Sequence, residues 1–104
     1  MRQNKIYSLL GLAARGRNVV SGEFSTENAI RNSSAVLVIV AKDASDNTKK
    51  LFNDKCSFYH VPVYTYGTKV ELGQAMGKGE RSSLALINEG LAQTITKHLE
   101  EIEN

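Results

Sequence analysis

Apolar side chains recur at helical spacing in several stretches of the chain. In the first stretch, the apolar residues at positions 6, 9, 10 and 13 follow the i, i+3, i+4, i+7 rule, so we expect a helix that ends near residue 15. The same spacing, or a capping sequence, predicts four further helices. These begin at Glu23, after the polar run 42–47, at the capping-box sequence 68–71 and shortly before Leu91.

Shorter stretches between these helices are predicted to be strands. Residues 35–41 form a continuous run rich in β-branched side chains, which is typical of a central strand covered on both faces. Residues 61–66 alternate as a strand, and Pro62, which cannot donate a ladder hydrogen bond, places them at an edge or at the start of a strand. Residues 17–20 and 84–87 complete the set. Alternating helices and strands predict an α/β fold, a three-layer α/β/α sandwich of about four mixed strands with helices on both faces.

The length of 104 residues, or 11.4 kDa, corresponds to a single domain over residues 1–104. Cys56 is the only cysteine and cannot form an intramolecular disulfide, so we expect a reducing compartment, the cytoplasm. No apolar run approaches the length that a membrane-spanning helix needs. A formal charge of +2 and a pI near 8.8 permit RNA binding without indicating it.

The charges are unevenly distributed along the chain. Residues 1–22 contain four basic residues and no acidic one, a local charge of +4, whereas residues 84–104 contain four Glu and one Lys, a local charge of −3. Opposed ends of this kind can present a basic patch on a nearly neutral molecule, and ordinary solvated helix faces explain the same charges equally well.

Motifs of common enzymes and metal sites do not fit this sequence. The run 73–79 has the wrong glycine spacing for a phosphate-binding loop and lacks the Ser or Thr that would bind magnesium. His60 and His98 belong to no metal-binding spacing, and Cys56 at an apolar helix position is expected to be a buried core residue. We therefore expect no catalytic residue, no metal and no cofactor.

Two loops and one lysine are the remaining candidates for function. The segment 21–26 combines a glycine with a helix N-terminus, whose free amides attract phosphate oxygens. The segment 77–81 adds two cations on a flexible backbone, and Lys42 follows the predicted central strand. Plain connecting turns are the alternative interpretation of both loops.

Six sequence blocks are specific enough to compare with a known family: LGLAAR (10–15), VSGE (20–23), AIR (29–31), LVIVAKDAS (37–45), NTKK (47–50) and ELGQAMGK (71–78). In this order they resemble the kink-turn RNA-binding ribosomal protein family, also called the L-seven-Ae/L-thirty-e group. The short bacterial branch, usually encoded beside translation initiation factor two, is the most similar. The resemblance runs from about Lys5 to about Ile95, nearly the whole chain.

The resemblance implies a non-enzymatic, cytoplasmic protein that binds a sharply bent RNA internal loop with tandem sheared G·A pairs. The implied partner is structured RNA, either ribosomal RNA or the ribosome, rather than a membrane or a small molecule, and we expect a monomer. In this family the N-terminus of the second helix enters the RNA major groove, and the loop before the last strand covers flipped-out bases. The RNA-binding residues expected here are Gly22, Glu23, Phe24, Ser25, Asn28, Arg31, Lys42, Lys78 and Arg81.

This chain departs from the RNA-reading segment of the family, which typically runs Gly-x-Asn-Glu-x-x-Lys. Gly22 is retained, but Phe24, Ser25 and Asn28 replace the Asn, the Glu and the Lys. The lost carboxylate and the lost lysine are each worth about 1–3 kcal/mol in typical base readout.

Basic side chains elsewhere in the chain can compensate for these losses by contacting RNA phosphates. Phe24 could stack on a base if it is exposed, although the apolar pattern favours Phe24, Ala29 and Ile30 as the inner side of the second helix. The departures also motivate a second hypothesis, a protein-interaction module on the same fold. A third, a small hydrolase or transferase, depends only on the architecture, which does not fix function.

Overall fold

The protein alternates helices and strands along its length. A computed structural model describes residues 4–103, and the side chains of residues 4–102. Within these residues the elements follow in the order α1 (Lys5–Arg15), β1 (Val19–Ser21), α2 (Glu23–Arg31), β2 (Leu37–Val40), α3 (Asp46–Tyr59), β3 (Val63–Thr65), α4 (Lys69–Ala75), β4 (Ser83–Leu86) and α5 (Glu89–Glu103). Each predicted helix and strand is present, with ends shifted by a few residues.

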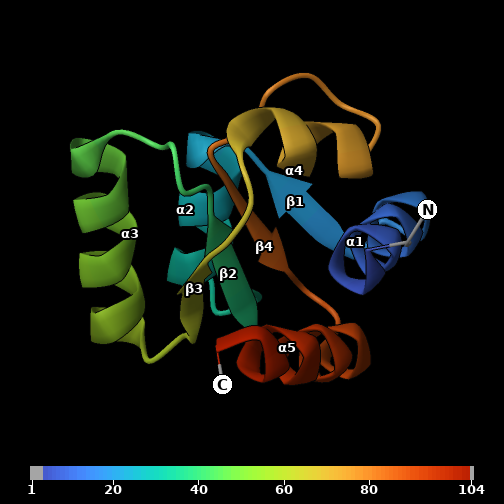
Figure 1. Ribbon diagram of the computed structural model, residues 1–104. Helices are drawn as coiled ribbons and strands as arrows, with labels where there is room; N and C mark the ends of the chain where they lie inside the picture. The colour runs from blue at the N-terminus through green and yellow to red at the C-terminus, as the bar shows by residue number, and fades with distance from the viewer. Residues whose placement is uncertain (1–3, 104) are drawn as a thin grey trace.

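The four strands form one mixed sheet in the order β1-β4-β2-β3. β2 and β3 are parallel, and β4 runs antiparallel to both β1 and β2. α2 and α3 pack on one face of the sheet, and α1, α4 and α5 form a layer on the other (Figure 1). The predicted three-layer α/β/α sandwich is therefore confirmed.

The core lies on both faces of the two central strands. All residues of β2 and of β4 are buried, as expected for strands covered on both sides. β3, the strand that follows Pro62, is at the edge of the sheet, as predicted. Cys56 is buried in this core at 1% exposure, and burial raises the pKa of its thiol to about 11.

The expected inner side of α2 is wrong at one residue. Ala29 and Ile30 are buried, but Phe24 is 77% exposed and Thr26 is buried instead. At 3.6 residues per turn, two residues are separated by about 200° around a helix axis, so Phe24 and Thr26 lie on opposite sides. The buried side of α2 therefore begins at Thr26, and the first turn presents Phe24 to solvent.

Glycine at one position lets the long loop between α4 and β4 fold back onto α4. A Cβ atom on Gly73 would overlap the carbonyl group of Gly79 and would lie 3.2 Å from the carbonyl oxygen of Lys78. The backbone amide of Lys78 donates to the carbonyl of Gly73 at 2.8 Å. The loop is thus held against its own preceding helix.

Candidate nucleic-acid interface

Three segments that are distant in sequence meet at one end of the sheet, the upper end in Figure 1. The amide of Gly22 donates to the carbonyl of Ser83 at 3.0 Å, and the amide of Ala41 donates to the carbonyl of Ser82 at 2.8 Å. In the strand register, Ser21 lies opposite Leu84 and Val40 opposite Ser83, so β1 and β2 end on either side of the beginning of β4. The predicted loops therefore lie at the same end of the sheet, which also carries Lys42.

α2 begins without the side-chain cap that the other helices have. Asn4, Ser45 and Thr68 cap α1, α3 and α4, and Asn88 accepts from the amide of Leu91 in the first turn of α5. The first residue before α2 is Gly22, with no side-chain cap hydrogen bond within the described residues. The first-turn amides of α2 are thus open to an anion from outside the protein.

The conformation of Gly22 explains why glycine stands at this position. Its φ of +94° lies in the region that L residues rarely adopt. A Cβ atom there would meet nothing within 4 Å, so the space above Gly22 is open. A ligand can approach this backbone closely.

A buried pair of hydroxyl groups fixes α2 on the sheet. Thr26 and Ser83 are both 0% exposed, and the Oγ of Ser83 donates to Oγ1 of Thr26 at 3.3 Å. This contact joins the first turns of α2 to the first residue of β4. The candidate segment 21–26 includes Thr26, but the burial of these two hydroxyls was not predicted, because an isolated Thr or Ser gives no pattern that distinguishes a buried hydroxyl from an exposed one.

Arg81 joins the α4–β4 loop to β1. Its Nε donates to the Oγ of Ser21 at 3.0 Å, and its Nη1 donates to the carbonyl of Glu80 at 3.0 Å. Its own amide donates to the carbonyl of Lys69 at 3.0 Å. Arg81 therefore brings a partly buried positive charge beside the segment that leads into α2.

Lys42 and the α4 N-terminus lie on the other side of β4. The amide of Lys42 donates to the carbonyl of Gly67 at 2.7 Å, while its side chain is exposed. Asp43, which follows, accepts from the amide of Lys69 at 2.8 Å and so joins the β2–α3 loop to α4. Gly22 and Val40 are both level with Ser83 in the register, so they are two strand spacings, about 10 Å, apart, and Lys42 follows two residues after Val40.

The remaining residues predicted for α2 fall into two groups. Glu23, Phe24, Ser25 and Asn28 are not buried, and Phe24 and Asn28 lie one turn apart on the same side of the helix. Arg31 is at the opposite end of α2, about 12 Å along the helix axis from Glu23. Its Nη1 lies 3.9 Å from Oε2 of Glu27, which also pairs with Lys55 at 3.5 Å. The structure therefore separates Arg31 from the rest.

Lys78 lies on the α1 side of the loop, where it lines a cavity together with Arg15 and Arg17. We use the name loop-end surface for the accessible residues of the first turns of α2 (Gly22, Glu23, Phe24, Ser25, Asn28) with Lys42 and Arg81. Lys78 borders this surface rather than lying within it.

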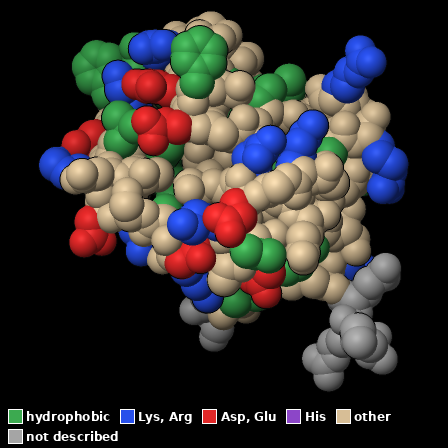
Figure 2. All heavy atoms as spheres, turned by 90° about the horizontal axis from the view of Figure 1, so that it is seen from above, with side chains coloured by type: hydrophobic (Ala, Val, Ile, Leu, Met, Phe, Trp, Pro, Cys, Tyr) green, Lys and Arg blue, Asp and Glu red, His purple; other side chains and the backbone are tan. Residues whose placement is uncertain are grey.

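Acidic and basic side chains are unevenly distributed over this end of the molecule. Figure 2, which views the structure from above, shows acidic and basic side chains intermixed on the left, over α3. Toward the right edge of the view the visible charged side chains are Lys and Arg, whereas acidic side chains also appear near the centre. α4 itself carries the exposed Glu71 in its first turn. A polyanion would therefore meet the fewest acidic side chains at the right edge of this view.

Within the described part of the chain, no three His, Cys, Asp or Glu side chains gather where a metal ion could be held. None of the helices in residues 4–103 has the length and apolar character to cross a bilayer.

The fold is that of a family of ribosomal proteins. Residues 4–96 match the Ribosomal protein L7Ae/L30e/S12e/Gadd45 family, and the chain belongs to that family. The resemblance stated from the sequence blocks is thereby confirmed.

Two relatives and one solved structure illustrate this membership. The chain is 42% identical over 94 residues to the RNA-binding protein YlxQ of Bacillus subtilis, covering 90% of this chain and 94% of that protein. It is 33% identical over 90 residues to the large ribosomal subunit protein eL30 of Tetrahymena thermophila, covering 85% of this chain and 86% of that protein. A protein of unknown function from Bacillus halodurans C has a similar structure, with a TM-score of 0.91 and 38% identity over 94% of this chain and 99% of that chain.

Proposed function

We propose that this protein binds structured RNA containing a kink-turn, through the loop-end surface, and that it acts in the cytoplasm in association with ribosomal RNA or the ribosome. The observation that carries the proposal is the uncapped N-terminus of α2 beside the α4–β4 loop, in a chain of this family. The family description and the names of the relatives point to a protein without catalysis.

The physical basis of RNA binding is a combination of backbone amides, cations and one exposed ring. The open amides of the α2 first turn suit a phosphate or a base edge at the bend of the RNA. Lys42 and Arg81 flank them and would contact phosphates. Phe24, exposed on the same turn, offers a ring on which an unstacked base can lie.

Binding of a kink-turn is tested by titrating the protein with two RNAs at two salt concentrations. The first RNA carries tandem sheared G·A pairs, and the second differs only in substitutions that disrupt those pairs. We expect tighter binding of the first RNA at both salt concentrations, because the bend is recognised by shape. We also expect weaker binding at high salt, because phosphate contacts release counterions.

A lysine variant links this binding to the loop-end surface. Lys42→Gln should weaken binding of the kink-turn RNA and lower its salt dependence, whereas Lys97→Gln, an equal change of charge on α5, should leave both unchanged. Equal and weak binding of the two RNAs by the wild-type protein would overturn kink-turn recognition.

The alternative function, a protein-interaction module, is favoured by the same exposed Phe24 and by the replaced residues Ser25 and Asn28. A pull-down from a nuclease-treated lysate distinguishes the two functions. Recovery of one protein partner after RNA digestion would favour the module, and loss of ribosomal material after digestion would favour RNA binding.

A further inference from the structure

A cavity of about 570 Å³ lies between α1, β1 and the region where α4 passes into the α4–β4 loop. Its basic residues come from three different segments: Arg15 from α1, Arg17 from the turn after α1 and Lys78 from the loop after α4. No Asp or Glu is among its described lining residues. We call this cavity the basic groove.

The walls of the basic groove are fixed by close backbone packing. A Cβ atom on Gly11 would lie 3.1 Å from the carbonyl oxygen of Ala75, so α1 and α4 approach each other closely at this point. The same Cβ would lie 3.7 Å from Nη1 of Arg15, so the guanidinium group lies back along α1. The close approach of α1 and α4 therefore fixes the backbone on one side of the groove.

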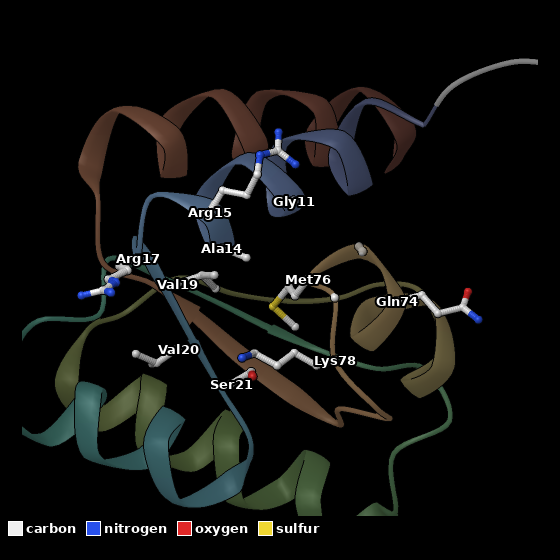
Figure 3. A pocket seen from close by; sticks show the side chains of 12 residues that line it. Gly11, Ala14, Arg15, Arg17, Val19, Val20, Ser21, Gln74, Met76 and Lys78 are labelled. Atoms are coloured by element: carbon white, nitrogen blue, oxygen red, sulfur yellow. The ribbon is translucent and has the colours of Figure 1, made fainter.

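Ser21 connects the basic groove with the loop-end surface. It lines the groove, accepts the hydrogen bond from Nε of Arg81, and directly precedes Gly22. Figure 3 shows Lys78 extending from the loop toward β1, on the side where Ser21 lies. A strand of nucleic acid that reaches the α2 N-terminus can thus continue into the groove without crossing an acidic side chain that lines it.

We propose that the basic groove binds the phosphodiester backbone of RNA that flanks the bend, so that the RNA footprint extends from α2 across β1 to α1. The three basic side chains do not converge on one point: Arg15 and Arg17 point in different directions in Figure 3, and Lys78 comes from the opposite wall. Charges spread over a groove match successive phosphates of a strand better than one free phosphate. This inference depends on the proposed RNA-binding function.

The test compares two kink-turn RNAs, one with stems cut to the minimum that holds the bend and one with both stems extended. The variant is Arg15→Gln/Arg17→Gln. Its matched control is Lys5→Gln/Lys97→Gln, which removes the same charge from the other end of α1 and from α5. Thermal unfolding of all proteins checks that the fold is retained.

We expect the Arg15→Gln/Arg17→Gln variant to bind the extended RNA on the order of tenfold more weakly at about 0.1 M salt, with a slope of log affinity against log salt lower by roughly 1.4–1.8, because two phosphate contacts are lost. Binding of the short RNA should be nearly unchanged, and the control should match the wild-type protein on both RNAs.

Equal affinity of the variant and the wild-type protein for the extended RNA would overturn the groove proposal while leaving the proposed function intact. Failure of the wild-type protein to bind either RNA would overturn the proposed function and the groove proposal together. Adding adenosine monophosphate as a competitor distinguishes binding of an RNA strand from binding of a single nucleotide. If it displaces the extended RNA from the wild-type protein but not from the variant, the groove is a mononucleotide site and the proposal is wrong.

Discussion

Phe24 is exposed because it lies on the side of α2 that faces away from the sheet, and the buried side starts two residues later. Single exposed apolar side chains are common on protein surfaces, so exposure alone does not indicate a ligand. It does leave the ring of Phe24 accessible for stacking on an unstacked base. The residue that replaces the Asn of the family motif therefore offers a different kind of contact rather than none.

We expect Phe24→Ala to change the free energy of unfolding by less than about 0.5 kcal/mol, because the ring is mostly solvated. The variant should bind kink-turn RNA with a binding free energy weaker by about 1–3 kcal/mol, the usual contribution of one base stacked on an aromatic ring. Phe58→Ala is the matched control, since Phe58 is 75% exposed at the far end of α3. Urea unfolding and RNA titration give the two quantities, and an unchanged RNA affinity of Phe24→Ala would contradict a stacking role.

Ser25 and Asn28 lie outside the core, so residues of the family motif can be restored at both positions without disturbing it. Ser25→Glu/Asn28→Lys leaves the net charge unchanged. We expect it to increase the affinity for kink-turn RNA by about 1–3 kcal/mol per restored base contact. The gain should be absent with the G·A-disrupted RNA. A loss of affinity would mean that this chain holds the RNA in a different register.

At the scale of elements, the α4–β4 loop depends on Gly73. We expect Gly73→Ala to lower the free energy of unfolding by about 1–3 kcal/mol, because its Cβ would overlap the backbone of Gly79 and force the loop away from α4. RNA affinity should fall too, since the same loop carries Lys78 and Arg81. Gly90→Ala in α5 is the control: its Cβ would meet only Asn88, at 3.5 Å, and alanine favours a helix. Equal stability of the two variants would show that the loop does not need this packing.

Tyr7 and Glu71 connect α1 to the first turn of α4. The hydroxyl of Tyr7 donates to Oε1 of Glu71 at 2.9 Å, and the same oxygen accepts from the amide of Thr68 at 3.1 Å. These hydrogen bonds, with the charge of Lys42 as a smaller cause, lower the pKa of Glu71 from its ordinary value of 4.5. Burial and the bond to Glu71 raise the pKa of Tyr7.

A lowered carboxyl pKa stabilises the folded state at pH values above the ordinary pKa, and the stabilisation is lost as the pH falls through the lowered value. Glu71→Gln should therefore be less stable than the wild-type protein at pH 7. The difference in melting temperature should shrink as the pH falls below about 4. Thermal unfolding between pH 7 and pH 3 tests this, and a difference that stays constant over that range would exclude the ionised carboxylate as its source.

Some elements could be predicted from the sequence because their patterns are local. The β-branched run at 37–40 and the capping box at 68–71 contain in themselves the reason for a buried strand and a helix start. The orientation of α2 could not be predicted in the same way, because nine residues contain too few apolar positions to fix the phase of its first turn. The hydrogen-bond partner of the buried Thr26 is the hydroxyl of Ser83, 57 residues away, which no local pattern could reveal.

At the scale of the whole molecule, the fold class followed from alternating helices and strands, but the strand order did not. β4, the last strand in sequence, lies between β1 and β2. That insertion brings the α4–β4 loop beside the α2 N-terminus. The two candidate loops and Lys42 were predictable as single features, whereas the basic groove was not, because its residues come from segments that only the fold brings together.

The basic N-terminal segment and the acidic C-terminal segment lie in different parts of the fold. Arg15 and Arg17, from the basic N-terminal segment, line the basic groove, while Glu100 and Glu101 are exposed on α5. α5 lies across the opposite end of the molecule from α4 (Figure 1). We therefore expect RNA to approach with α5 directed away from it.

The most direct test of the central claim is an NMR titration of the isotopically labelled protein with kink-turn RNA, in which the backbone amide shifts are followed residue by residue. We expect the largest changes at 22–28 and 77–81, with smaller changes at Lys42 and little change along α5. Changes concentrated on α3 or α5, with the α2 first turn unaffected, would contradict the assignment of RNA binding to the loop-end surface.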